Sequence, residues 1–226
     1  MPHLATEFVV GVTDAYLSQA QPLHTRYDES VQRNMEHQPL IARVLGDAYI
    51  TLRLARLTVD EAIDAQCRVK VVVLEGAKEV EVDGEGVGVV DAIFASLLNR
   101  YGREYASLKT LALAGFSVSA NIESKRGQSG VDAAGTIVID VCNSEGNRFS
   151  FSDTSRSVTS STARAVLSVV EYFINSERAF IMLDKARRDA IDRNRDDLVT
   201  RYTAEMAELV ESTSYTDVIQ SIRARL

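Results

Sequence analysis

The spacing of hydrophobic residues changes along the chain and divides its 226 residues into three regions. In the first region, residues 1–66, apolar side chains recur at helical spacing after Pro39, and proline is well tolerated in the first turn of a helix. Thr58 and Glu61 have the spacing of a capping box, which predicts a short helix over 59–66. We therefore expect a helical N-terminal extension. The apolar stripe of its main helix consists of Ile41, Val44, Leu45, Ala48, Leu52 and Ala55.

The second region, residues 67–183, combines strand patterns with helical ones. The expected elements are strands over 68–74 and 78–83, a helix over 90–101, strands over 108–122, 136–142 and 148–152, and a second long helix. Apolar parity shifts before Phe116, so a bulge or bend is expected at Gly115. Because groups of strands followed by a helix occur twice, the pattern predicts an α+β fold with two units in a pseudo-repeat.

The third region, residues 184–226, is charged and helical. Arginine and aspartate side chains interleave along it, which is typical of a solvated helix face. Met206, Leu209 and Val210 are the candidate buried stripe. A nucleic-acid interface is not expected here, because the acidic side chains cancel the field of the arginines.

Composition narrows the class of protein. Apolar residues make up 46% and charged residues 25%, as in an ordinary globular domain. A net charge of −7 argues against general nucleic-acid binding. There is no apolar run long enough to cross a bilayer and no secretory pattern at the start, so we expect a cytoplasmic protein without a membrane partner. Cys67 and Cys142 are expected to be reduced thiols in or near the core.

Histidine is confined to the beginning of the chain, at His3, His24 and His37. The main body therefore has no imidazole for a Ser-His-Asp or Cys-His site, or for a catalytic zinc site. We expect no catalytic residues, no metal and no cofactor, and hence no independent enzymatic activity.

The candidate ligand-binding features are the N-terminal ends of two predicted helices. The glycine-rich stretch 84–88 precedes the first long helix, where free N–H groups attract anions, but its spacing matches neither a dinucleotide fingerprint nor a P-loop. The hydroxyl-rich stretch 157–162 precedes the second helix. Ordinary turns and caps explain both stretches more simply, because turn glycines are common and hydroxyls cap helices well. As a ligand site, they would suit a small zwitterion, with its carboxylate at a helix start and its ammonium on Asp91 or Asp132.

Three motifs, in this order, carry a family resemblance: GVGVVDA at 86–92, GVDAAG at 130–135 and SVTSSTARA at 157–165. With the matching elements between them, the stretch from about Arg68 to Asn175 resembles the C-terminal regulatory, or allosteric dimerisation, domain of 2-isopropylmalate synthase and the related citramalate synthases. The resemblance implies two βββα-type units that pair between subunits. It also implies that leucine or isoleucine binds the domain and inhibits a distant catalytic barrel.

The resemblance also implies an effector site. This sequence departs from the family pattern there at two positions: Val89 stands where the family usually has proline, and Val87 replaces a commonly polar residue. The implied ligand-binding residues are Val87, Gly88, Val90, Asp91, Ala133, Gly135, Val158 and Thr159.

The catalytic barrel of that family cannot fit into residues 1–66, so we expect a non-catalytic, homodimeric regulatory domain that binds a branched-chain amino acid. The alternative is an assembly module that has lost its effector and docks a separately encoded catalytic subunit through 1–66 and 184–226. A third possibility is an enzyme site made of Asp91 or Asp132 with Lys125 or Arg126, but exposed loop charges explain those residues better.

Overall fold

The structure, a computed structural model, describes residues 37–120 and 134–210. A helix over 37–45 comes first. The further elements are η1 (Gly46–Ala48), β1 (Leu52–Asp60), β2 (Cys67–Glu75), β3 (Lys78–Gly86), α3 (Val89–Tyr101), η2 (Ala106–Thr110), β4 (Ala112–Ala120), β5 (Gly135–Cys142), β6 (Arg148–Ser155), α4 (Val158–Asp192) and α5 (Asp196–Val210).

The chain builds the same unit twice. Each unit is a three-stranded antiparallel sheet, ordered β1-β2-β3 or β4-β5-β6, followed by a helix. The first strand of each sheet has a register shift, between Leu54 and Arg56 and between Leu113 and Gly115. Two residues separate the third strand from the helix in both units. The predicted α+β fold of two βββα units is therefore confirmed, as is the bulge at Gly115.

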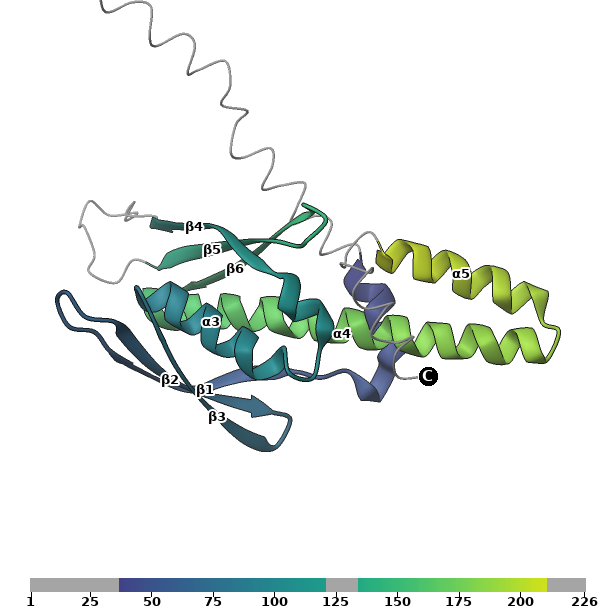
Figure 1. The fold of residues 1–226 in the computed structure, drawn as a ribbon, viewed down its shortest axis with the longest axis horizontal. Helices are drawn as coiled ribbons and strands as arrows, with labels where there is room; N and C mark the ends of the chain where they lie inside the picture. The colour runs from purple at the N-terminus through teal and green to yellow at the C-terminus, as the bar shows by residue number, and fades with distance from the viewer. Residues whose placement is uncertain (1–36, 121–133, 211–226) are drawn as a thin grey trace, which may run out of the picture.

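The helices lie between the two sheets (Figure 1), with β4–β6 above them and β1–β3 below in that view. Helix α3 packs on β2 and β3, α4 packs on β5, β6 and β1, and the two helices contact each other. The inner faces are apolar because alternate strand residues point the same way. Fully or almost fully buried examples are Val69, Val71, Val73, Ile137, Ile139 and Val141.

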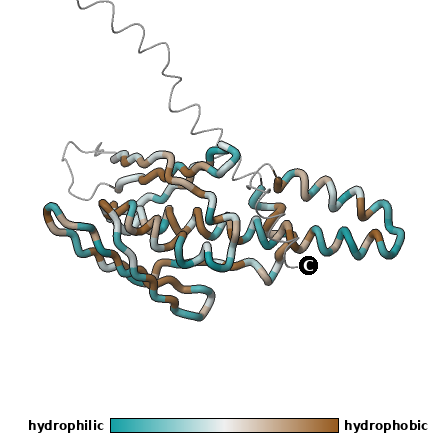
Figure 2. The backbone as a smooth tube through the Cα atoms, viewed as in Figure 1, coloured by the Kyte–Doolittle hydropathy of each residue, from teal (hydrophilic) through white to brown (hydrophobic). Residues whose placement is uncertain are grey.

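Helix α4 is 35 residues long, about 52 Å at 1.5 Å per residue, and extends beyond both sheets. There α5 folds back beside it, and the two form a helical hairpin whose far end is hydrophilic (Figures 1 and 2). The predicted charged helices are confirmed for the described part of that region. Arg187 and Arg188 both pair with Asp184, so much of the charge is neutralised within one helix. Of the predicted apolar stripe, Leu209 is buried.

The middle of α4 holds the start of β1 in place. The Asn175 side chain accepts the Ile50 N–H at 2.9 Å and donates to the Ile50 carbonyl at 2.8 Å. The Glu171 carboxylate accepts the Leu52 N–H at 2.7 Å and the Tyr49 hydroxyl at 3.1 Å. Burial, together with the Glu171 charge, raises the pKa of Tyr49 to about 12, so this hydroxyl keeps its proton. These polar groups are therefore satisfied in a largely apolar setting.

The helical prediction was wrong for residues 52–66. The first helix ends before Gly46, which has a positive φ of 49°, and 52–60 is strand β1, paired with β2 along its length. Residues 61–66 form a turn instead of a helix. The first sheet thus includes residues that the sequence analysis assigned to a helical extension. The spacing of Leu52 and Ala55 fits a helix, but hydrogen bonding to a distant strand decides the outcome.

Smaller differences concern glycines and strand limits. Gly84 and Gly86 belong to β3 rather than to a turn. The strand predicted over 108–122 begins later than expected, because residues 108–110 belong to the 3-10 turn η2 and β4 begins at Ala112. Cys67 is buried in the core, and Cys142 is half-buried. In the described ranges, no helix combines the length and the apolar character that crossing a membrane requires.

Candidate functional site

The two helix starts lie at the same end of the domain. Helices α3 and α4 contact each other and run in the same direction away from that end (Figure 1). Each follows the last strand of its sheet after two residues, 87–88 in the first unit and 156–157 in the second. The pseudo-repeat therefore places two equivalent backbone-rich turns on one side of the molecule.

The first turn leaves its helix start open. Gly88 is the N-cap of α3, and no side chain caps this helix. Asp91, in the first helical turn, accepts the Val87 N–H at 3.1 Å through its carboxylate. The Val87 side chain is 90% exposed. The first-turn amides of α3 therefore have no side-chain cap, and Asp91 and Val87 beside them are exposed.

Two of the three motif glycines serve packing and not a ligand. A Cβ on Gly84 would overlap the Ser96 Cβ of α3, and a Cβ on Gly86 would lie 2.6 Å from the Ala92 backbone nitrogen. A Cβ on Gly88 would meet no atom within 4 Å. Gly84 and Gly86 thus let β3 approach α3 closely.

The second turn is capped by its own hydroxyls. The Ser157 Oγ accepts the Ser160 N–H at 3.2 Å, and the Ser155 Oγ accepts the Ser157 N–H at 3.1 Å. The Ser155 and Ser161 hydroxyls lie 2.8 Å apart. The capping interpretation therefore holds for these serines. Thr159, half-buried in the first turn of α4, makes no side-chain hydrogen bond to another residue that the structure describes.

An ion pair fixes the second turn of α4 to β6. The Arg164 guanidinium binds both carboxylate oxygens of Asp153, at 3.0 and 2.8 Å. Burial acts to raise the pKa of Asp153, but the bonds from Arg164 and Ser161 outweigh it, so this pKa is lowered. Asp153 is thus a structural carboxylate, held ionised by its partner.

Two of the predicted motifs meet at the start of β5. Gly135 is buried, and a Cβ placed on it would lie 4.0 Å from a Val158 methyl group, at ordinary contact distance. Val90 and Thr159 occupy equivalent positions, the second residues of α3 and α4, and both are half-buried. Ala133, like Asp132, lies outside the described residues. The structure therefore brings Gly135 and Val158 together, and it places the remaining described members at the two helix starts.

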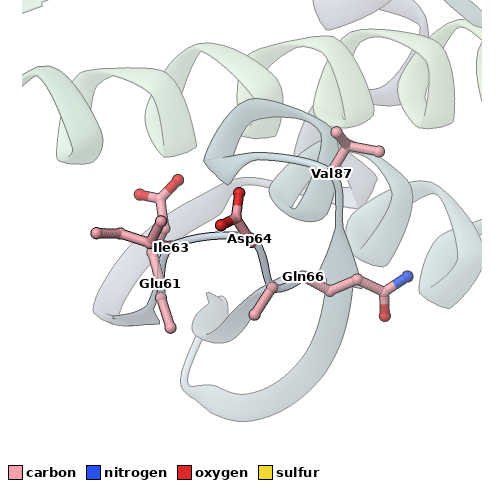
Figure 3. Close-up of a pocket in the computed structure, with 7 residues that line it drawn as sticks. Glu61, Ile63, Asp64, Gln66 and Val87 are labelled. Atoms are coloured by element: carbon pink, nitrogen blue, oxygen red, sulfur yellow. The ribbon is translucent and has the colours of Figure 1, made fainter.

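A hollow of about 610 Å³ adjoins the first turn (Figure 3). It is lined by residues 61–66, which link β1 to β2, and by Val87. Ile63 is 94% exposed, and Asp64 has a positive φ of 60°. The acidic side chains of Glu61 and Asp64 stand beside the apolar ones of Ile63 and Val87 around this hollow.

The sequence analysis missed this loop, although an internal repeat marks it. Ile63-Asp64-Ala65 stands before β2 where Val131-Asp132-Ala133 stands before β5. The register supports the correspondence, because Cys67 pairs with Gly86 as Gly135 pairs with Ser155. The family-like Asp-Ala motif of the second unit therefore has a counterpart in the first. Among residues 37–120 and 134–210 there is no cluster of side chains suited to a metal ion.

Comparison with known protein families matches residues 34–174 to the LeuA allosteric (dimerisation) domain. The chain belongs to this family. The match includes both βββα units and ends within α4, so the second half of α4 and α5 lie beyond it. No curated protein matches the chain. The family assigns this protein a regulatory dimerisation role, in agreement with the sequence-based resemblance.

Proposed function

We propose that this LeuA-type domain binds a free branched-chain amino acid as an allosteric effector. The observation that carries the proposal is the placement of both helix starts at one end of the domain, with an open hollow beside the start of α3. The uncapped start of α3 and the first turn of α4 offer N–H groups to a carboxylate. Regulatory dimerisation domains need such a site if a metabolite is to select between two arrangements of the dimer.

Each part of the amino acid has a matching group. The carboxylate is assigned to the hydroxyl of Thr159 and to the amides of Val158 and Thr159 in α4, because the Ser157 hydroxyl already accepts the Ser160 N–H. The ammonium is assigned to the carboxylates of Asp91 and Asp64, both of which are exposed. The aliphatic side chain would contact exposed valine and isoleucine, namely Val87, Val158 and Ile63. The remaining contacts that the family resemblance implies are Gly88, Val90, Ala133 and Gly135.

The exposure of Val87 favours this proposal over the loss of effector binding. A domain that had lost its effector would be expected to fill the niche with its own side chains. Val87 instead projects into solvent at the rim of the hollow (Figure 3), and Val89 packs against the core. The ligand space beside the first turn is therefore open. The assembly-module alternative, with a separate catalytic subunit, would require the titrations below to be silent.

Helix α4 connects the proposed site with the rest of the domain. Its first turn forms part of the site, and its middle binds both β1 and η2, since the Glu177 carboxylate accepts the Ser107 N–H at 2.9 Å. A ligand that shifts α4 would therefore move contacts in both units together. Binding would act through its different affinity for two dimer arrangements.

Calorimetric titration with leucine, isoleucine and valine tests the proposal. Thr159→Val removes the assigned hydroxyl and should weaken binding at least about 10-fold, since a hydrogen bond to a charged group contributes roughly 1.5–3 kcal/mol. Thr203→Val is the matched control, because Thr203 lies on α5 and its hydroxyl donates only to the Val199 carbonyl of its own helix. The absence of heat with all three amino acids, together with unchanged thermal stability, would refute effector binding.

A further inference from the structure

A second hollow, of about 690 Å³, lies at the C-terminal end of α3. It is bounded by one side of the second half of that helix, by the turn that follows, and by η2. Asn99, which lines it, comes eleven residues after the N-cap Gly88, a distance of about 16 Å along the helix. The volume is within the range of small-molecule pockets. This hollow is therefore separate from the proposed effector site at the start of α3.

The floor of the second hollow is apolar. Phe94, Leu108 and Leu111 line it, and each is 8% exposed or less because each also belongs to the core. Leu98, which is half-buried, lies beside them. An alkyl or aromatic group placed in the hollow would leave water for a surface that the core already holds in place.

The charged residues of this hollow are both cationic. Arg103 and Lys109 line it, and both are exposed. A Cβ on Gly102 would lie 3.6 Å from the Lys109 Cγ, so the two cationic side chains start from the same corner. Within residues 37–120 and 134–210, neither side chain has a hydrogen bond or an ion pair with another residue. Glu104, next to Arg103, bonds instead to Arg100 at 2.6 Å. Two unneutralised cations thus stand together in a chain of net charge −7.

The end of α3 does not need these cations as caps. Its Leu98 carbonyl accepts the Gly102 N–H at 2.7 Å, and its Tyr101 carbonyl accepts the Tyr105 N–H at 3.0 Å. The helix dipole favours positive charge at this end, but it gives no reason for an apolar hollow beside that charge. Charge and floor together match a ligand that has an anionic head and an apolar body.

We propose that this hollow binds an amphiphilic organic acid, a carboxylate with an alkyl or aromatic body and no ammonium group. The carboxylate would pair with Arg103 and Lys109, and the Asn99 amide would be a further donor. A free amino acid fits less well, because the described lining offers no carboxylate to its ammonium. The hollow beside Val87 has the opposite character, with acidic residues and no cation in its lining. The two ends of α3 would therefore select different ligands.

Calorimetric titration of the full chain with octanoate and with octylammonium tests this site. The two probes carry similar alkyl chains with opposite charges, and both are used below their micelle concentrations. We expect octanoate to bind at least about 10-fold more tightly, because two cations attract it and repel octylammonium. Arg103→Gln and Lys109→Gln should each weaken octanoate binding about 2–5-fold. Arg56→Gln is the matched control, since Arg56 is an exposed cation of β1 outside the lining.

A charge series at Asn99 gives a second measurement of opposite sign. Asn99 is exposed on α3, so its replacement leaves the packing of the helix intact. Asn99→Asp should weaken octanoate binding about 2–5-fold, and Asn99→Lys should strengthen it by a similar factor. Thermal unfolding of each variant checks that the fold is retained.

Four results would overturn the site: no binding of octanoate, equal affinity for the two probes, Asn99 variants that bind octanoate alike, or displacement of octanoate by leucine. The last would place octanoate in the effector site. Leucine binding is measured in its own titration. Silence with leucine while octanoate binds would refute only the effector proposal, and the reverse would refute only this one.

Discussion

Replacing Gly84 by alanine tests the packing role of the glycine motif. Gly84 lies in β3 directly against α3, and the structure leaves no room for a methyl group at this position. The added Cβ would overlap the Ser96 Cβ and lie 3.2 Å from the Ala92 carbonyl oxygen. Ser96 is buried, and its own Cβ cannot rotate away. Relief therefore requires β3 and α3 to separate.

The loss of stability follows from that separation of β3 from α3. Overpacking a core by one methyl group typically costs about 1–3 kcal/mol. The close contact here is with helix atoms fixed by the backbone, so we expect the upper part of this range, about 2–3 kcal/mol. For a chain of this length, such a loss lowers the melting temperature by roughly 4–12 °C.

Urea and thermal unfolding, followed by circular dichroism, measure the effect. Gly88→Ala is the control within the same motif, because a Cβ there meets nothing and the φ of −153° suits any residue. Its expected change is within about 0.5 kcal/mol, since weaker capping and lower unfolded-state entropy offset each other. Adding Ser96→Gly to Gly84→Ala removes the overlapping Cβ. The double variant should be more stable than the sum of the two single changes implies.

Equal stability of Gly84→Ala and Gly88→Ala would refute this reasoning. So would strict additivity in the double variant, because the two Cβ atoms would then not interact. Loss of amino-acid binding by Gly84→Ala without loss of stability would instead place Gly84 in the ligand site.

Three further predictions concern the fold and the ligand. Asn175→Ala leaves the Ile50 N–H and carbonyl without their partner, so it should cost about 2–4 kcal/mol, measured by urea unfolding. The lowered pKa of Asp153 means that its pairing with Arg164 stabilises the fold above the ordinary carboxyl pKa near 4 and is lost as pH falls through the lowered value. Arg164→Gln should therefore cost up to about 1 kcal/mol at pH 7 and almost nothing once the pH is below the lowered pKa of Asp153, in urea unfolding at each pH. A branched-chain amino acid at 100 times its dissociation constant should stabilise the domain by about 2.7 kcal/mol, visible as a rise in melting temperature.

The sequence was sufficient to predict the strands and helices whose hydrophobic pattern can be recognised within a short stretch of the chain. The β-branched run over 68–74 and the helical stripe from Val90 to Tyr101 predicted β2 and α3, because both signals are local. It failed at 52–60, where Leu52 and Ala55 fit a helical stripe and a bulged strand equally well. Pairing with β2 and the hydrogen bonds from α4 decide between them, and neither can be seen in a local window.

The candidate site also has parts that the sequence predicts and parts that depend on contacts between distant residues. The sequence located both helix starts and the Asp91 carboxylate, but it could not tell a ligand-binding glycine from one required for packing, because that depends on Ser96 and Ala92 across the β3–α3 contact. Nor did it include the 61–66 loop. Asp64 and Ala65 repeat the Asp-Ala motif of the second unit, but the repeat is only three residues long, and it becomes convincing through the shared strand register.

The extent of α4 gives a physical reason for treating the hairpin as part of the regulatory unit. The family match ends at residue 174, yet the helix continues to Asp192 without a glycine or proline at which it could kink. Its first turn belongs to the proposed effector site, and its last turns carry α5. A tilt of α4 at the effector end must therefore move the hairpin, unless the bonds of Asn175 and Glu171 to the start of β1 act as a pivot. Asn175→Ala weakens that pivot, so it should alter the hydrogen exchange of α5 on effector binding, whereas Thr203→Val should not.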